Sequence, residues 1–315
     1  MPVNVPKVIY LDQFAWIKLA RIHFGKEKDP ELVAAHAKVL QAADSGKVLF
    51  PLSIVTISET LNRKEPHSRR RLAEFLIRVS KGVTICPYTV LREIEIRNAV
   101  RKRVGIYEFP VNPVALGIAN AFGATPEIEG NITSEIKAKL RDLVISPQTL
   151  LWLLSNQQLA GQMFPHGEGT PEKMEEIRKK DFAELPDAAF RKRVHLARNM
   201  VDLLSETITK YCVDNKILIQ TVIPQGSTQE SLLGLFQDCK TTYVSCRLTY
   251  CRDQHKDRPI ERNDLNDIAA LSMAIPYCDV VVTENFWTSI AKQEKLDSVY
   301  NTAIISSVTE LAKHL

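Results

Sequence analysis

Four acidic residues stand where the sequence leads us to expect the end of a strand or the start of a helix. Asp12 follows the β-rich run KVIYL, and Glu284 follows CDVVVT, a short apolar run typical of a strand buried on both faces. Glu59 and Asp267 fall in the first turns of two expected helices. Each acid alone has a structural explanation, because such a carboxylate is more often a helix cap or a surface side chain than a catalyst. Their chemistry therefore depends on whether the fold brings them together.

The elements around these acids alternate between strand and helix at both ends of the chain. Strands are expected at 7–11, 47–52, 83–86, 278–283 and 299–306, with helical patterns between them. This alternation predicts an α/β fold with a parallel sheet flanked by helices. In such a sheet, strand carboxyl ends and the amino ends of the following helices gather along one edge, where ligands bind. We therefore expect the four acids to converge at that edge.

A cluster of carboxylates at one edge calls for cations, because three or four such groups repel one another when nothing binds between them. Oxygen ligands of this kind suit hard divalent ions, so the expected cofactor is Mg²⁺ or Mn²⁺. Such ions can activate water and stabilise a leaving oxygen, which suits phosphodiester hydrolysis. Asp264 is either a further ligand or a helix cap, and Asp279, at the start of its strand, is expected to be structural.

The order of these motifs resembles the PIN-domain-like nucleases, over about residues 5–103 and 258–315. The motifs are YLDQF at Tyr10–Phe14, SIVTISE at Ser53–Glu59, DIAALSMA at Asp267–Ala274 and DVVVTEN at Asp279–Asn285. The resemblance implies a metal-dependent ribonuclease whose catalytic residues are Asp12, Glu59, Asp267 and Glu284. We expect metal ligands at Asp12, Asp267 and Glu284, with Asp264, an acid beyond the family motifs, as a further ligand. The family often has Asp where this chain has Glu284, so either Glu284 or Asn285 could be the ligand.

Basic residues lie beside the acidic motifs. Arg103 ends a charged helix expected at 88–103, and Arg258 and Arg262 come shortly before the helix that carries Asp267. Carboxylates repel RNA phosphates, so positive charge must be supplied around the site. These three arginines and Asn285 are the predicted substrate-binding residues. The alternative is a solvated surface or a dimer interface, because charged helix faces are common.

Helical patterns dominate the middle of the chain. We interpret residues 105–240 as a helical insertion between a first core segment, 1–104, and a second core segment, 241–315. The insertion is expected to shape substrate access, with the basic run Arg191–Arg193 as a further source of positive charge. Its role does not follow from the resemblance, since it is no part of the compact family core.

Composition limits the other classes of function. The chain has 315 residues, a net charge of +4, and the apolar and charged shares of an ordinary globular protein. It shows no apolar run of membrane-spanning length and no secretory signal. Six scattered cysteines without a CxxC pair favour a reducing, cytoplasmic compartment. Cys239, Cys246, Cys251 and His255 match no common zinc-binding spacing, so small core residues are favoured over a zinc site.

The predicted function is therefore metal-dependent endoribonuclease activity. RNA is the expected partner, and DNA stays open because nothing in the sequence reads a 2′-hydroxyl. The competing class is a non-catalytic nucleic-acid-binding protein with the same fold. A homodimer and an inhibitory protein partner also stay open, as does a role as a toxin, in defence or in RNA processing.

Overall fold

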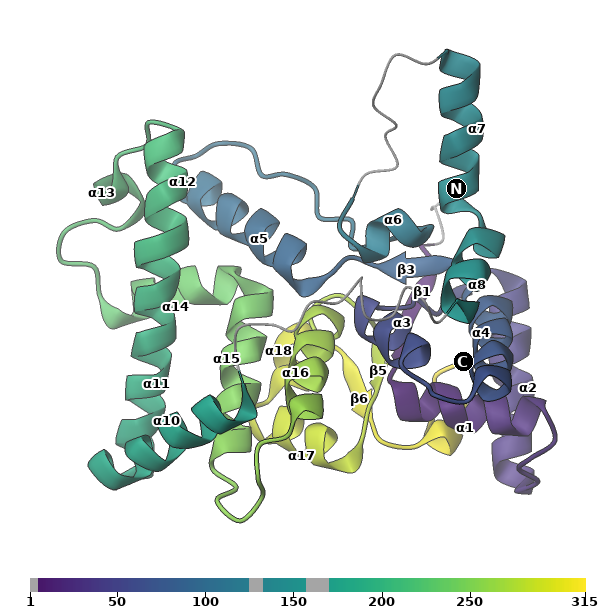
Figure 1. The fold of residues 1–315 in the computed structure, drawn as a ribbon. Coiled ribbons are helices and arrows are strands. Elements are labelled where there is room, and N and C mark those ends of the chain that lie inside the picture. The colour runs from purple at the N-terminus through teal and green to yellow at the C-terminus, as the bar shows by residue number, and fades with distance from the viewer. Residues whose placement is uncertain (1–4, 125–132, 157–169) are drawn as a thin grey trace. The chain divides into compact units, whose positions relative to one another are not determined.

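The computed structural model describes residues 5–124, 133–156 and 170–315 (Figure 1). The chain divides into two compact units. The first comprises Met1–Pro87, Pro113–His166 and Met273–Leu315, and the second comprises Tyr88–Asn112 and Gly167–Ser272. Each unit is therefore built from segments that lie far apart in the sequence.

The first unit contains a four-stranded parallel sheet in the order β2-β1-β5-β6, which confirms the predicted α/β class. Its strands are β1 (Lys7–Leu11), β2 (Val48–Leu49), β5 (Val280–Val282) and β6 (Ala303–Ile305). The register pairs Leu11 of β1 with Val282 of β5. The residues that follow these two strands, Asp12 and Thr283, therefore lie at the same edge of the sheet.

A second pair of strands extends this arrangement within the first unit. β3 (Val83–Ile85) pairs antiparallel with β4 (Val114–Leu116), and Leu52, just beyond β2, exchanges two backbone hydrogen bonds with β3. Helical patterns were expected to dominate residues 105–240, and β4 was not among the expected strands. Three residues are too few to show an alternating pattern, and this strand owes its conformation to its pairing partner.

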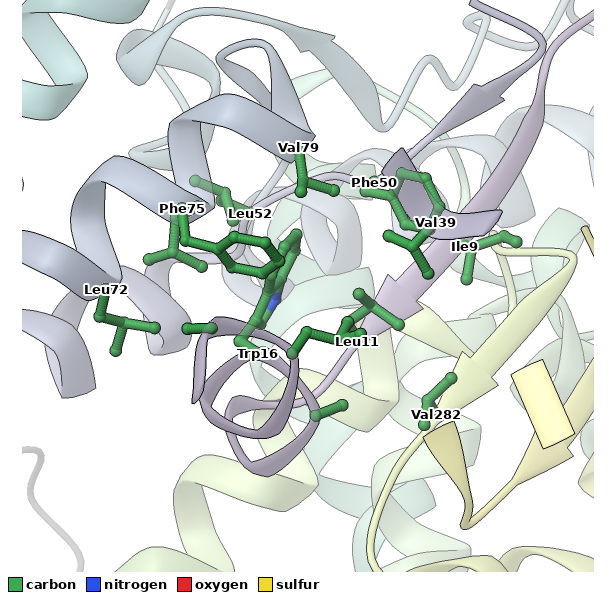
Figure 2. Packing of buried hydrophobic residues seen from close by; sticks show 14 of the residues in the cluster. Ile9, Leu11, Trp16, Val39, Phe50, Leu52, Leu72, Phe75, Val79 and Val282 are labelled. Atoms are coloured by element: carbon green, nitrogen blue, oxygen red, sulfur yellow. The ribbon is translucent and has the colours of Figure 1, made fainter. Parts of the chain in front are cut away.

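The core of the first unit fixes the helix that begins at the sheet edge. Helices α1 (Gln13–His23), α2 (Pro30–Ser45) and α4 (Pro66–Ser80) pack against one another, with α1 contacting β1. Trp16 of α1 meets Phe75 of α4 edge to face, with ring centroids 6.2 Å apart, and both rings are fully buried (Figure 2). Leu11 and Val282 continue this core at the strand ends. Truncating such a buried aromatic ring typically costs about 3–5 kcal/mol.

Seven further helices complete the described part of the first unit. They are α3 (Ile54–Leu61), α6 (Ile118–Ala121), α7 (Ser134–Ile145), α8 (Pro147–Ser155), α17 (Asn285–Gln293), α18 (Leu296–Tyr300) and α19 (Val308–Leu311). The last strand predicted at 299–306 is shorter than expected, because α18 occupies its first residues. Thr302 lies between the end of α18 and the start of β6. Its hydroxyl donates to the carbonyl oxygens of Ile275 at 2.7 Å and Cys278 at 3.0 Å, which fixes the chain just before the strand.

The second unit is built from helices. They are α5 (Tyr88–Arg103), α10 (Pro171–Glu184), α11 (Ala188–Asp202), a π-helix (Leu203–Ile208), α12 (Thr209–Asp214), α13 (Ile219–Val222), α14 (Gln229–Asp238), α15 (Lys240–Asp253) and α16 (Arg262–Ala274). Glu95 of α5 accepts hydrogen bonds from the backbone N–H and the hydroxyl of Thr241, at 2.8 and 2.7 Å. This buried contact joins α5 to the start of α15.

The two units differ from the predicted segments 1–104, 105–240 and 241–315. Residues 113–156, expected in the insertion, belong to the first unit because β4 pairs with β3 and α8 packs on α4. Helix α5, expected in the core, belongs to the second unit, where it packs on α14 and α15. Long-range packing decides this membership, and it leaves no mark on the local sequence pattern.

Candidate functional site

Asp12 lies where β1 passes into α1. Its backbone N–H donates to the carbonyl oxygen of Val282 at 3.0 Å, which ties the end of β1 to β5. Its side chain caps α1, because Oδ1 accepts from the backbone N–H of Gln13 at 2.7 Å. The cap that offers a structural explanation for Asp12 is therefore present. Asp12 is only 7% exposed.

The surroundings of this carboxylate go beyond the needs of a cap. Asp12 Oδ2 accepts a hydrogen bond from the hydroxyl of Thr283 at 3.0 Å. Burial raises the pKa of Asp12 and the nearby Glu284 raises it further, while the bonds from Gln13 and Thr283 lower it. In the part of the chain that the structure describes, no Lys or Arg forms an ion pair with Asp12. A buried carboxylate beside a second acid, without a basic partner, favours binding of a proton or a cation.

Glu284 occupies the N-cap position of α17, but its side chain makes no capping hydrogen bond. Both Glu284 and Asn285, the first residue of α17, are exposed. Glu284 directly follows Thr283, whose hydroxyl bonds Asp12 at 3.0 Å, and its charge raises the pKa of Asp12. The choice between Glu284 and Asn285 as the ligand stays a prediction.

Tyr10 connects Glu59 to the same neighbourhood. The Tyr10 ring is fully buried, and its hydroxyl lies 3.2 Å from Ser53 Oγ at the start of α3. Burial raises the pKa of the Tyr10 hydroxyl, and the charges of Asp12 and Glu59 raise it further. Thr283, which precedes Glu284, bonds Asp12, and Thr60, which follows Glu59, bonds Gln13, the residue after Asp12. These contacts bring the three predicted acids into one region of the first unit.

Hydroxyl side chains at the cap of α3 and within it form a further group that was not predicted from the sequence. Ser53 caps α3 and contacts the hydroxyl of Thr56 at 3.1 Å, and Thr60 donates to the Thr56 carbonyl at 2.8 Å. The side-chain amide of Gln13 donates to Thr60 at 3.3 Å, which links α1 to α3. The available signal was the spacing of hydroxyl residues at 53, 56 and 60, which places them on one face of a largely apolar helix.

Asp279 has the structural role expected from its place at the start of β5. Its carboxylate accepts from the backbone N–H of Val8 at 2.7 Å, and its own N–H donates to the Val8 carbonyl at 2.8 Å. These bonds fasten β5 to β1 at the end of the strands opposite to Asp12.

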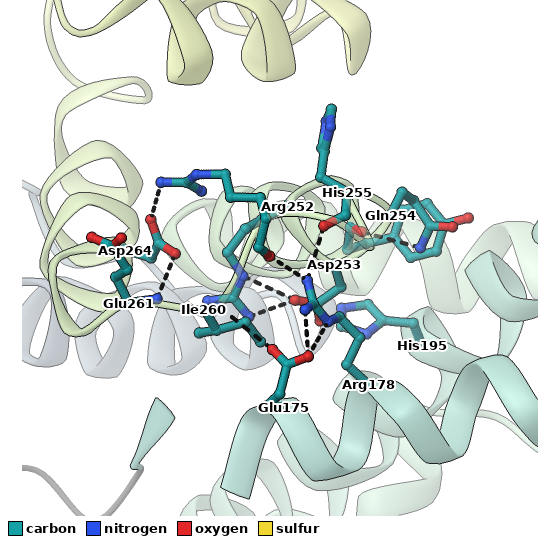
Figure 3. Close-up of polar contacts among 12 residues, drawn as sticks. Glu175, Arg178, His195, Arg252, Asp253, Gln254, His255, Ile260, Glu261 and Asp264 are labelled. Atoms are coloured by element: carbon teal, nitrogen blue, oxygen red, sulfur yellow. Dashed lines mark hydrogen bonds and ion pairs between the residues drawn. The ribbon is translucent and has the colours of Figure 1, made fainter. Parts of the chain in front are cut away.

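Asp264 and Asp267 lie on α16 in the second unit. Asp264 is 1% exposed and accepts from the Arg258 guanidinium at 2.6 Å. It also accepts from the Glu261 backbone N–H at 3.0 Å (Figure 3). Its charge is therefore compensated by a cation and by a backbone donor. Asp267 lies in the next turn and is half-buried. Metal binding by these two residues stays a prediction.

A buried arginine anchors the segment that precedes α16. Arg178 of α10 donates to the carbonyl oxygens of His255 at 3.0 Å and Arg258 at 2.9 Å, and it also pairs with Glu175 (Figure 3). The second oxygen of Glu175 accepts from the backbone N–H of Ile260 at 3.4 Å. The local sequence does not mark Arg178, because the two carbonyl oxygens that it bonds lie 77 and 80 positions away.

The predicted substrate-binding arginines have protein partners in this structure. Arg258 pairs with Asp264, and Arg103 donates to the Ala99 carbonyl at 2.9 Å and pairs with Asp238 at 2.8 Å. Arg262, at the start of α16, is exposed. RNA binding by these residues stays a prediction.

The predicted basic run on α11 is also engaged. Arg191 donates to the carbonyl oxygens of Leu185 and Pro186, each at 2.7 Å, and lies 4.1 Å from the centre of the Phe182 ring. Its guanidinium therefore holds the turn between α10 and α11.

The donor set around Asp12 suits a hard divalent cation, since it offers carboxylate oxygens without a basic competitor. Across residues 5–124, 133–156 and 170–315, however, no three His, Cys, Asp or Glu side chains are already grouped as a metal site. The three cysteines of the weak zinc alternative, Cys239, Cys246 and Cys251, are buried at and along α15.

Two general findings complete the description of the chain. No helix among the described residues combines the length and the apolar character needed to cross a membrane. No family model, curated protein or solved structure matches the chain.

Proposed function

We propose that this protein is a metal-dependent nuclease with a PIN-like fold that hydrolyses RNA phosphodiester bonds. The observation that carries the proposal is the state of Asp12. This carboxylate is buried at the carboxyl edge of a parallel sheet, next to Glu284, and its hydrogen-bond donors are neutral. A divalent cation would compensate the two acids, and such a cation on carboxylates at this edge suits phosphodiester chemistry.

In this proposal Asp12 and Glu284 hold Mg²⁺ or Mn²⁺. A bound ion of this kind supplies Lewis-acid stabilisation of charge on the phosphate and a water of lowered pKa. The Gln13 N–H and the Thr283 hydroxyl each bond a different oxygen of Asp12, so they fix the carboxylate plane while leaving further lone pairs free. Glu59 is the third acid proposed from the first unit, and Asp267 stays a predicted ligand on α16.

In this proposal the Tyr10 hydroxyl stays protonated and uncharged. Its raised pKa keeps the hydroxyl protonated at neutral pH, beside Ser53 and under the influence of two acids. A neutral phenol can hold the wall of the site without adding a further negative charge. We therefore assign Tyr10 a positioning role behind Asp12 and Glu59.

A cleavage assay on single-stranded RNA, structured RNA and single-stranded DNA tests the proposal. We expect RNA cleavage with Mg²⁺ or Mn²⁺, complete loss in excess EDTA, and a rate reduced by about 100-fold or more in Asp12→Asn. Asp279→Asn, which alters a carboxylate at the opposite strand end, serves as the matched control and should keep most of the rate. Cleavage that persists in EDTA, or in Asp12→Asn purified in the same way, rejects the mechanism.

Metal binding can be measured without any substrate. Calorimetric titration with Mg²⁺ or Mn²⁺ should give binding to the unmodified chain and much weaker binding to Asp12→Asn. At a free ion concentration of about 100 times Kd, the ion should stabilise the folded chain by about 2.7 kcal/mol. Nucleic-acid binding without any metal binding would support the alternative of a non-catalytic binding protein.

A further inference from the structure

A pocket in the first unit opens between α1, the turn after α3, and α4. Its apolar floor is formed by Ile17, Ala20 and Phe24 from the α1 side and by Leu72 from α4, around about 350 Å³ of empty space that includes open solvent. The guanidinium of Arg71 lies 5.3 Å from the centre of the Phe24 ring. An arginine next to an aromatic ring over an apolar floor can receive the flat face of a base.

The rim of this pocket is positively charged. It is formed by Arg21, Lys26, Arg63 and Arg71, together with the hydroxyl of Ser68. Within the described residues none of these four cations forms an ion pair with a carboxylate. Arg63 instead donates to Ser68 Oγ at 3.1 Å. Four cations at one pocket, none of them in an ion pair among the described residues, favour an anionic ligand.

The turn that carries Arg63 is held in place by a buried arginine of α4. Arg69 is 4% exposed, and its guanidinium donates to the Arg63 carbonyl at 2.7 Å. Glu65 is the acid close to Lys26, but its carboxylate caps α4 by accepting from the backbone N–H groups of His67 and Ser68. These contacts hold the turn at Arg63, and the four cations outnumber the one nearby acid, so the net charge of the rim stays positive.

One face of α1 leads from the acidic edge toward the pocket. Gln13, Ile17 and Arg21 are spaced four residues apart, so they follow one another on the same side of the helix. Gln13 bonds Thr60, and Arg63 lies three residues beyond Thr60. With a rise of about 1.5 Å per residue, Arg21 lies about 13 Å along the helix from Asp12. That distance corresponds to a few nucleotides of a strand, at about 3.4 Å or more each.

We propose that this pocket is a backbone phosphate subsite for single-stranded RNA, a few nucleotides from the scissile bond. This inference rests on the proposed function, and it names the path of the substrate in the first unit. The rim cations hold a phosphate, and the apolar floor with Phe24 and Arg71 holds the adjacent base. Stacking and charge without base-edge readout predict little sequence preference at this position.

Binding in EDTA tests the subsite separately from cleavage. The affinity of the full chain for a labelled single-stranded RNA is measured by fluorescence anisotropy over a series of salt concentrations. The double variant Arg21→Gln/Lys26→Gln removes two exposed rim charges and should weaken binding roughly tenfold, with the salt slope reduced by about 0.7 for each phosphate that the variant no longer neutralises. Lys18→Gln and Arg70→Gln remove exposed charges from α1 and α4 outside the pocket and should change affinity and slope much less.

Each outcome decides the inference. If the unmodified chain binds no single-stranded RNA, or if the rim variant binds with the affinity and slope of the two controls, the subsite is overturned. Arg63→Gln provides a second rim variant, and thermal unfolding of each variant shows that it is folded. If the rim variants lose binding while the unmodified chain cleaves no RNA with any metal, the nuclease proposal fails and the subsite stands.

Discussion

Two buried aspartates, one in each unit, occupy similar local positions but differ in electrostatic environment. Asp12 caps α1 and is 7% exposed, while Asp264 lies in the first turn of α16 and is 1% exposed. Asp264 has a guanidinium partner in Arg258 and a backbone donor in Glu261. Asp12 has two neutral donors and an acidic neighbour, Glu284, that raises its pKa.

The difference separates a structural acid from a functional candidate. A buried charge with a cation and a hydrogen-bond donor is compensated within the protein, so removing its partner should damage the fold. A buried acid whose pKa is raised by burial and by a second acid has an environment typical of functional sites. The helix-cap pattern in the sequence is common to both residues, and only the surrounding charges distinguish them.

The largest loss of stability is expected on removal of Arg178, which bonds the backbone of Arg258, the partner of Asp264. Arg178→Met should lower the free energy of unfolding by about 3–5 kcal/mol, because it leaves Glu175 and two carbonyl oxygens without their buried donor. Urea unfolding measures the change. Arg198→Gln is the matched control, since its pair with Asp181 is 48% exposed on the arginine side and should contribute about 0.5 kcal/mol. Equal effects of the two substitutions would contradict an anchoring role for Arg178.

A double-mutant cycle tests the pair formed by Arg258 and Asp264. Arg258→Met should cost about 2 kcal/mol, less than Arg178→Met, because the Arg258 side chain is 37% exposed. Combining it with Asp264→Asn should cost less than the sum of the two single changes, with a coupling energy of about 1 kcal/mol. Urea unfolding measures all three variants.

The same cycle weighs the predicted RNA contact of Arg258. If Arg258→Met leaves stability unchanged but weakens RNA binding and flattens its salt dependence, the arginine serves the substrate and not Asp264. A loss of stability with unchanged affinity of the folded protein supports the structural pairing.

Much of the fold followed from local pattern. The run KVIYL predicted β1 with its observed bounds, and the charged segment 88–103 predicted α5 with its observed bounds. KVIYL is rich in residues that favour strands and Asp12 follows it at once, while segment 88–103 is bounded by Pro87 and Gly105. The strand β4 and the membership of α5 in the second unit were not predictable in this way, because each depends on a partner far away in the sequence.

In the candidate site, too, local pattern predicted some residues and not those that depend on distant partners. The places of Asp12 and Glu284 at strand ends followed from the strands themselves, since parallel strands end at one edge. The pairing of Arg258 with Asp264 did not follow, although they are only six positions apart, because a basic residue near an acidic motif suits either an ion pair or a phosphate. Arg178 and Thr283 acquire their roles through partners from other parts of the chain, so tertiary structure alone identifies them.

A smaller change in stability is expected at Asp12, which has no basic partner among the described residues. In EDTA, Asp12→Asn should raise the free energy of unfolding near neutral pH by about 1 kcal/mol, because it removes a buried charge that has no basic partner. The pKa of Asp12 is raised in the folded protein, so the neutral acid stabilises the fold below the pKa of an unfolded aspartate, about 3.9. That stabilisation is lost as the pH rises through the higher folded value.

The difference in unfolding free energy between Asp12→Asn and the unmodified chain should therefore be small in acid, grow as the pH rises, and then level off. Taking this difference cancels the opposite trend of acids such as Asp44, whose pKa is lowered by Arg78 and Lys81. The same comparison can be made in a Thr283→Val background. Losing the Thr283 hydrogen bond should raise the pKa of folded Asp12 further, so the difference in unfolding free energy should keep growing to a higher pH before it levels off. A variant that is less stable than the unmodified chain at every pH would show that the Asp12 carboxylate is already compensated, and the contrast with Asp264 would fail.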